Sequence, residues 1–269
     1  MRMVWVLALA GLVTACAPEP EKQEAAQPTA SATRAPLPEA SPSAAPVERK
    51  VAERNDAFEF EYSWPAAASA IPELVVELEA DLARQRRELA AAAREGQAAA
   101  RENGLTYNPY AHAVNWSVVT ELPGWLSLSA AAYSYTGGAH PNHWSQALLW
   151  DKAAGKSRQA ADLFTSKAAL SEAIRAPFCA ALNRERSARR GEPVRSDSGE
   201  MFTECIDPTD STVILGSSNG QQFDRIGVLI GPYEAGPYAE GDYEVTLPVT
   251  RAVMAAVKPQ YRAVFAPGR

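Results

Sequence analysis

Apolar and polar residues alternate in the first segment of the chain that we expect to fold. In Phe58-Glu59-Phe60-Glu61-Tyr62 every second side chain is aromatic, a pattern typical of a strand with one buried face. From Pro72 onward apolar residues recur every three or four positions, which predicts a helix running to about Ala100 and stopped by Asn103-Gly104. The apolar positions of this helix are Ile71, Leu74, Val75, Leu78, Leu82 and Leu89.

Downstream, the same patterns predict a second group of strands and helices. A helix is expected over residues 166–190, and Pro177 inside it should kink or divide it. A short helix should follow at 250–257. Strands are expected at residues 114–118, 126–135, 144–150, 223–230 and 243–248. Because strands and helices do not alternate regularly, we expect an α+β fold with antiparallel sheet packed against helix.

The N-terminal residues have the pattern of a lipoprotein signal. Arg2 precedes an apolar run over residues 3–13, which is too short to span a bilayer but has the length of a signal-peptide core. The following Val13-Thr14-Ala15-Cys16 matches a lipobox, so we expect residues 1–15 to be removed and Cys16 to carry acyl chains such as palmitate. Ala17 in place of an aspartate favours an outer-membrane lipoprotein facing the periplasm. The alternative is an ordinary secretory signal with a chance cysteine.

Composition refines this picture between the signal and the fold. Residues 16–54 are rich in Pro and Ala, which indicates a semi-extended tether in the cell envelope. The whole chain of 269 residues has a formal net charge of -6, and removal of Arg2 gives 25 − 32 = -7 for the mature form. This acidic balance argues against nucleic acid as a partner.

Two cysteines remain after lipidation. Cys179 and Cys205 lie 26 positions apart in a chain that we expect to be exported, where a disulfide is the usual state. A catalytic thiol would need a nearby histidine, and all three histidines lie far upstream in the sequence.

Several runs of the sequence carry a family pattern. They are YTGGAHPN (135–142), LWDKAAGK (149–156), ADLF (161–164), IGVLI (226–230), Tyr233 and GPYAEG (236–241). Together they resemble the extracytoplasmic region shared by the anti-sigma factor RsiV and the N-terminal accessory region of the peptidoglycan deacetylase PdaC. The resemblance covers about residues 57–258. It implies two consecutive α+β modules, a PdaC-like one at 55–143 and an RsiV-like one at 144–258, followed by a tail at 259–269.

The resemblance also implies an envelope location and, from the best understood member, recognition of lysozyme. The chain departs from both relatives, because it has no transmembrane segment after the lipobox and no deacetylase motif. An Asp-Asp pair and a His-Ser/Thr-x-x-His motif are both absent from the sequence. We therefore expect a non-catalytic module that binds a lysozyme-like cell-wall-directed protein or peptidoglycan, without a cofactor.

His140 and His143 define the alternative. Their spacing would suit a metal site if the turn brings them together, with His112, Asp151 or Asp162 as a third ligand, and the protein would then be a metal-assisted hydrolase of envelope glycans. The simpler interpretation is a glycine turn stiffened by proline. As ligand-binding residues we propose Tyr135, Gly137, Gly138, His140, Asn142, Tyr233 and Tyr238.

Overall fold

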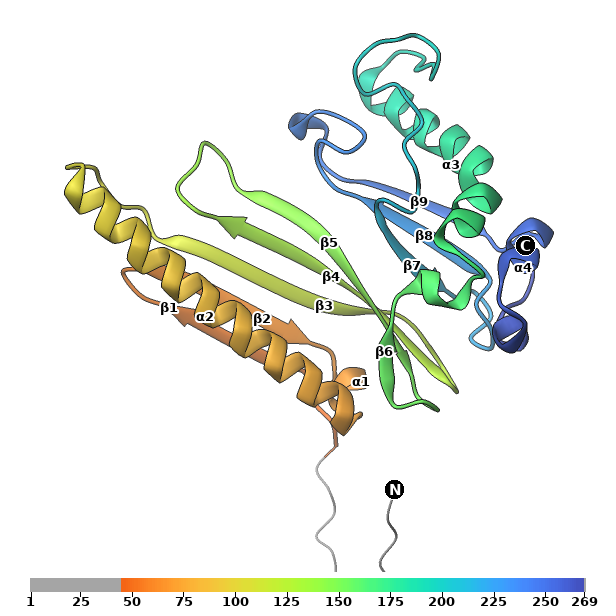
Figure 1. Ribbon diagram of the computed structural model, residues 1–269, viewed down its shortest axis with the longest axis horizontal. Helices are drawn as coiled ribbons and strands as arrows, with labels where there is room; N and C mark the ends of the chain where they lie inside the picture. Colours follow the sequence, from red (N-terminus) through yellow and green to blue (C-terminus); the bar gives the residue numbers. More distant parts are fainter. Residues whose placement is uncertain (1–44, 269) are drawn as a thin grey trace, which may run out of the picture. The chain divides into compact units, whose positions relative to one another are not determined.

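Two β-sheets organise residues 45–268, the part of the chain that this computed structural model describes (Figure 1). The signal peptide, Cys16 and most of the predicted tether lie outside the described residues. The strands of the first sheet lie in sequence order: β1 (Arg49–Arg54), β2 (Phe58–Trp64), β3 (Tyr110–Leu122), β4 (Trp125–Tyr135), β5 (Asn142–Asp151) and β6 (Lys156–Arg158). The second sheet contains β7 (Thr212–Gly216), β8 (Arg225–Ile230) and β9 (Tyr243–Pro248). The predicted α+β class is confirmed.

Helix α2 (Pro72–Glu102) covers part of the first sheet. Its buried leucines, Leu74, Leu78, Leu82 and Leu89, pack on the aromatic residues of β2 that the alternation placed inward. The short helix α1 (Ala66–Ser69) precedes it. The other neighbouring strands of both sheets pair antiparallel, as expected, while β2 and β3 pair in parallel. The reason is that α2 carries the chain back along the sheet, and such a crossover returns the next strand in the same direction.

Helix α3 (Lys167–Arg190) packs against the second sheet. Its N-cap is Ser166, whose hydroxyl accepts a hydrogen bond from the Ala169 backbone N–H at 3.0 Å. Pro177 does not divide this helix, because the stripe Ile174, Phe178 and Leu182 on either side of it is buried in the second core. The remaining elements are η1 (Ala160–Leu163), η2 (Tyr238–Glu240), α4 (Arg251–Ala256) and η3 (Pro259–Val264).

The borders of the two modules differ from those we expected. Strand β1 lies within the range assigned to the tether and pairs antiparallel with β2. The boundary at residues 143/144 falls inside β5, so the first sheet extends to Arg158. At the other end Phe265 is 2% exposed and forms a bridge with Phe223, which makes residues 259–265 part of the second core and not a tail.

Candidate functional site

Three aromatic rings from distant parts of the chain meet between the β4–β5 hairpin and the loop after β8. The His140 ring lies 4.0 Å from the Tyr238 ring at an interplanar angle of 27°. The Tyr233 ring lies 5.7 Å from Tyr238 and 6.2 Å from His140. We call His140, Tyr233 and Tyr238 the His–Tyr cluster. The first pair is stacked and the other two are tilted, and such ring contacts are favourable and fix the rings relative to one another.

Hydrogen bonds fix the orientation of the cluster. His140 Nδ1 lies 2.9 Å from the Pro141 carbonyl, so Nδ1 carries the proton and donates. The other ring nitrogen is then an acceptor, and the Tyr233 hydroxyl donates to it over 3.2 Å. The Tyr238 hydroxyl donates to the same Pro141 carbonyl over 2.9 Å. One carbonyl of the hairpin thus holds both His140 and Tyr238.

Tyr233 has an unusual backbone. Its φ is +67°, in the left-handed region that a residue with a Cβ seldom adopts. A tight turn holds it there, since its N–H donates to the Gly236 carbonyl over 3.0 Å. The side chain is nevertheless 54% exposed. Strained residues of this kind concentrate at functional sites, because the surrounding structure must hold them in place.

His143 lies beside the cluster but faces a different partner. Its Nε2 is 3.2 Å from an Asp242 carboxylate oxygen, and its ring meets the Tyr238 ring edge-on at 5.5 Å. Across residues 45–268, no three His, Cys, Asp or Glu side chains lie close enough together to hold a metal ion. His140 and His143 are thus engaged separately, one by a tyrosine and one by a carboxylate.

The three candidate third ligands for a metal lie elsewhere. Asp151 is buried and forms an ion pair with Arg158 at 2.8 Å. Asp162 accepts from the Gln159 backbone N–H in a capping box. His112 lies between β3 and α2, where it contacts Gln85.

The other sequence-predicted ligand-binding residues do not join the His–Tyr cluster. Gly137 has φ +83° at the tip of the hairpin and lies against Tyr110 near the end of α2. Tyr135 is opposite Ala111 in the β3–β4 register. Gly138 and Asn142 are exposed parts of the same hairpin. The structure therefore brings together three of the seven predicted residues.

Arginines of α3, which we did not select from the sequence, hold the loop that carries the two tyrosines. Arg186 is fully buried and donates to the Ala235 carbonyl over 2.8 Å. Arg190 forms an ion pair with Glu240 at 2.8 Å, and this hydrogen bond holds the pKa of Glu240 below its usual value. Arg189 lies 3.9 Å above the Tyr243 ring. Their three- to four-residue spacing on one helix was the available signal, but charged helical residues usually face solvent.

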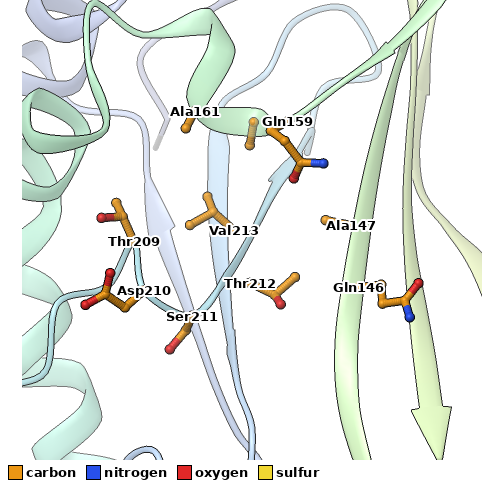
Figure 2. Close-up of a pocket in the computed structure, with 10 residues that line it drawn as sticks. Gln146, Ala147, Gln159, Ala161, Thr209, Asp210, Ser211, Thr212 and Val213 are labelled. Atoms are coloured by element: carbon orange, nitrogen blue, oxygen red, sulfur yellow. The ribbon is translucent and has the colours of Figure 1, made fainter.

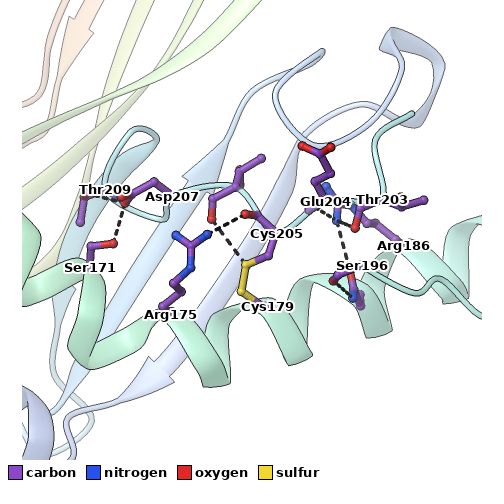
Figure 3. Close-up of a disulfide and its surroundings, with 12 residues drawn as sticks. Ser171, Arg175, Cys179, Arg186, Ser196, Thr203, Glu204, Cys205, Asp207 and Thr209 are labelled. Carbon is purple, nitrogen blue, oxygen red and sulfur yellow. Dashed lines mark hydrogen bonds between the residues drawn. A yellow bond between two sulfur atoms is a disulfide. The ribbon is translucent and has the colours of Figure 1, made fainter. Parts of the chain in front are cut away.

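A disulfide joins Cys179 of α3 to Cys205, as we predicted from the export signal (Figure 3). The segment next to Cys205 supplies acceptors for Arg186, which donates to the carbonyls of Thr203 at 3.3 Å and Glu204 at 3.0 Å. Closing a loop of 26 residues stabilises a fold by about 3.5 kcal/mol in the chain-entropy model. The disulfide thereby supports the carbonyls that position Arg186, and Arg186 supports the tyrosine loop.

A polar pocket of about 430 Å³ lies away from the His–Tyr cluster, between β5, η1 and the start of β7 (Figure 2). Gln146 from β5, Gln159 and the segment Thr209–Val213 line it. Lys167 donates to Asp210 at its rim over 2.9 Å. None of the ligand-binding residues predicted from the sequence lines this pocket.

Residues 51–143 match the family model described as deacetylase PdaC. The predicted resemblance to PdaC is confirmed. Two solved structures of the DUF3298 family are similar to the chain, each at 16% identity and a TM-score of 0.49. The alignment with the protein from Bacteroides fragilis NCTC 9343 covers 75% of this chain and 90% of that protein. The alignment with the protein from Pseudomonas aeruginosa PAO1 covers 82% of this chain and 97% of that protein. No curated protein matches the sequence.

The PdaC match supports an extracytoplasmic module. Within residues 45–268, no helix is both long and apolar enough to cross a membrane. The match ends at residue 143, directly after the hairpin that contributes His140. The other two residues of the His–Tyr cluster, Tyr233 and Tyr238, lie outside the matched range.

Proposed function

We propose that this protein is a non-catalytic cell-envelope binding protein and that the His–Tyr cluster is its contact surface. The observation that carries the proposal is Tyr233, a half-exposed aromatic side chain held at positive φ and hydrogen-bonded to His140. A tyrosine fixed in this way offers a large contact area without losing much conformational freedom on binding. Such aromatic residues are the ones that contribute most to binding at protein interfaces.

The charges around the cluster favour a basic protein as the partner. Asp242 is 54% exposed beside His143, and exposed Glu234 adjoins Tyr233 in the loop. The chain as a whole is acidic, with a net charge of -6. A negative rim around an aromatic centre increases the rate of encounter with a positively charged partner. A cell-wall-directed protein such as lysozyme, the partner implied by the RsiV resemblance, fits this description.

The location belongs to the same proposal. Lipidation at Cys16 would anchor the chain to the outer membrane, and the tether would hold the folded part in the periplasm. Mass spectrometry of the membrane-extracted protein should find acyl chains on the N-terminal peptide that begins at Cys16. A Cys16→Ser variant should leave the membrane fraction, and retention of that variant in the membrane would contradict the anchor.

Binding of the full-length chain to immobilised lysozyme and to purified peptidoglycan sacculi tests the contact surface. We expect binding to lysozyme that weakens with added salt. A Tyr233→Ala variant should bind at least about tenfold more weakly, as expected for loss of an interface anchor. Val76→Ala is the matched control, because Val76 is 69% exposed on α2.

Three results would overturn the proposal. The first is the absence of any binding to lysozyme. The second is binding to sacculi alone, which would make the glycan and not a protein the partner. The third is equal weakening by Tyr233→Ala and Val76→Ala, which would remove the His–Tyr cluster from the contact surface.

A further inference from the structure

A second cavity lies on the opposite face of β5 from His143. It has a volume of about 390 Å³ and is bounded by α2 on one side and by β3, β4 and β5 on the other. Trp144 projects into it, because neighbouring residues of a strand point to opposite faces. The volume is within the range of small-molecule sites in proteins. We call this cavity the Trp144 cleft.

A chain of hydrogen bonds fixes the chemical state of His112 in this cleft. Asp81 accepts from the Gln85 side-chain amide over 2.6 Å, which orients the Gln85 carbonyl oxygen toward His112. His112 Nε2 must therefore carry the proton and donate to that oxygen. Burial lowers the pKa of His112, so the ring is neutral at neutral pH. Its Nδ1 is left as a hydrogen-bond acceptor.

Further polar groups of the cleft have no protein partner. The side chains of Ser134, Thr136 and Gln146 line it and make no hydrogen bond to any other residue in the range 45–268. Nδ1 of His112 likewise has no partner among these residues. Trp144 adds an aromatic face, tilted at 45° to the His112 ring at 5.9 Å. One wall thus offers both donors and acceptors next to an aromatic ring.

The charged groups at the edge of the cleft are paired with one another. Arg84 and Glu88 form an ion pair at 2.9 Å on adjacent turns of α2. Arg84 also contacts Asp81. The cleft therefore offers no unpaired charge from these residues to a ligand, and it favours a neutral molecule that has many hydroxyl or amide groups.

We propose that the Trp144 cleft is a saccharide-binding site. A pyranose ring stacks its C–H face on Trp144, and its hydroxyl or acetamido groups bond to Gln146, Ser134 and Thr136. One ligand hydroxyl donates to Nδ1 of His112. Neutral sugars meet these requirements because they present an apolar ring face together with donors and acceptors around the ring edge.

Isothermal titration and saturation-transfer NMR on the full-length chain test this site. The soluble probes are N-acetylglucosamine and its β-1,4-linked disaccharide, with cationic glucosamine and anionic glucuronate as charged comparators. Purified sacculi are the polymeric probe and distinguish a free sugar from a wall glycan. We expect neutral acetylated sugars to bind more tightly than either charged comparator.

Variants locate the binding. Trp144→Leu and Gln146→Ala should each weaken saccharide binding by about tenfold, the factor expected for loss of a stacking partner or of a hydrogen bond to a buried group. Val76→Ala should leave saccharide binding unchanged, because Val76 is 69% exposed and does not line the Trp144 cleft. If Trp144→Leu fails to fold, Gln146→Ala and Ser134→Ala test whether the sugar binds in the cleft. Both variants truncate partly buried side chains that make no protein hydrogen bond.

The site is supported if the soluble sugars, or sacculi alone, bind and the Trp144 and Gln146 variants weaken that binding. The proposal is overturned if neither probe binds the full-length chain. It is also overturned if binding survives these variants unchanged or is lost in Val76→Ala. These results are independent of lysozyme binding, so the two proposals can fail separately.

Discussion

Replacing Tyr233 by glycine and by alanine separates the backbone strain from the side-chain contacts. Both variants remove the same ring, which is 54% exposed, and both lose the hydrogen bond to His140. They differ only in how they tolerate φ +67°. The left-handed conformation costs a residue with a Cβ about 1–2 kcal/mol. Glycine avoids that cost but loses about 0.5–1 kcal/mol more conformational entropy on folding.

The difference between these terms gives the expected magnitude. Tyr233→Gly should be more stable than Tyr233→Ala by about 0.75 kcal/mol. Tyr238 provides the matched control pair, because it lies at negative φ in η2 within the same cluster. There the order should reverse, with glycine less stable than alanine by about 0.5–1 kcal/mol.

Urea denaturation of the four variants, followed by tryptophan fluorescence, measures these free energies of unfolding. Thermal melts should agree, at about 2–4 °C per kcal/mol for a domain of this size. The reasoning is refuted if Tyr233→Ala is as stable as Tyr233→Gly, or if both positions show the same order. Under the proposed function, both Tyr233 variants should weaken lysozyme binding equally, because both lack the ring that we propose as the contact.

Three further predictions concern the groups that support the site. Replacing Cys205 by alanine, or adding a reductant, should lower the free energy of unfolding by about 3.5 kcal/mol in urea denaturation; an unchanged midpoint would contradict this. Arg186→Met should lower the free energy of unfolding by about 2–4 kcal/mol, because it leaves the carbonyls of Ala235, Thr203 and Glu204 without their donor. A decrease below about 1 kcal/mol, measured by calorimetry, would disprove this. The pKa of His112 is lower in the folded chain than in the unfolded chain, so near and below about pH 6.5 the unfolded chain binds more protons. The contribution of neutral His112 to stability is therefore complete above that pH and is lost as the pH falls through the folded pKa. Unfolding curves at pH 7, 6 and 5 should show this loss, and a His112→Asn variant with the same slope would exclude His112 as its cause.

Local patterns were sufficient to predict much of the fold. The alternation at 58–62 and the leucine spacing after Pro72 correspond to β2 and α2, because each pattern places a whole apolar face toward one core. Strand β1 was missed because RKVAER has almost no apolar alternation and follows a proline-rich stretch. Its stability comes from pairing with β2, and the residues of β1 alone do not reveal this pairing.

The candidate site was harder to predict for the same physical reason. Tyr233 and His140 are 93 residues apart, and only the packing of two modules brings them into contact. Glycines and prolines around the aromatic residues did mark the two loops as exposed. Nothing local distinguished buried Arg186 from the other arginines of α3, since its partners are backbone carbonyls that any sequence provides.

The end of the PdaC match does not coincide with a structural boundary. Strand β5 pairs with β4 from Trp125↔Asp151 to Ser134↔Asn142, and Trp150 is buried in the first core. A segment ending at residue 143 would therefore expose the edge of β4 and lose part of that core. The hairpin that begins β5 also carries His140 to the tyrosines of the second module. The first sheet and the proposed contact surface consequently depend on the same continuation of the chain, so that binding through the His–Tyr cluster requires both modules together.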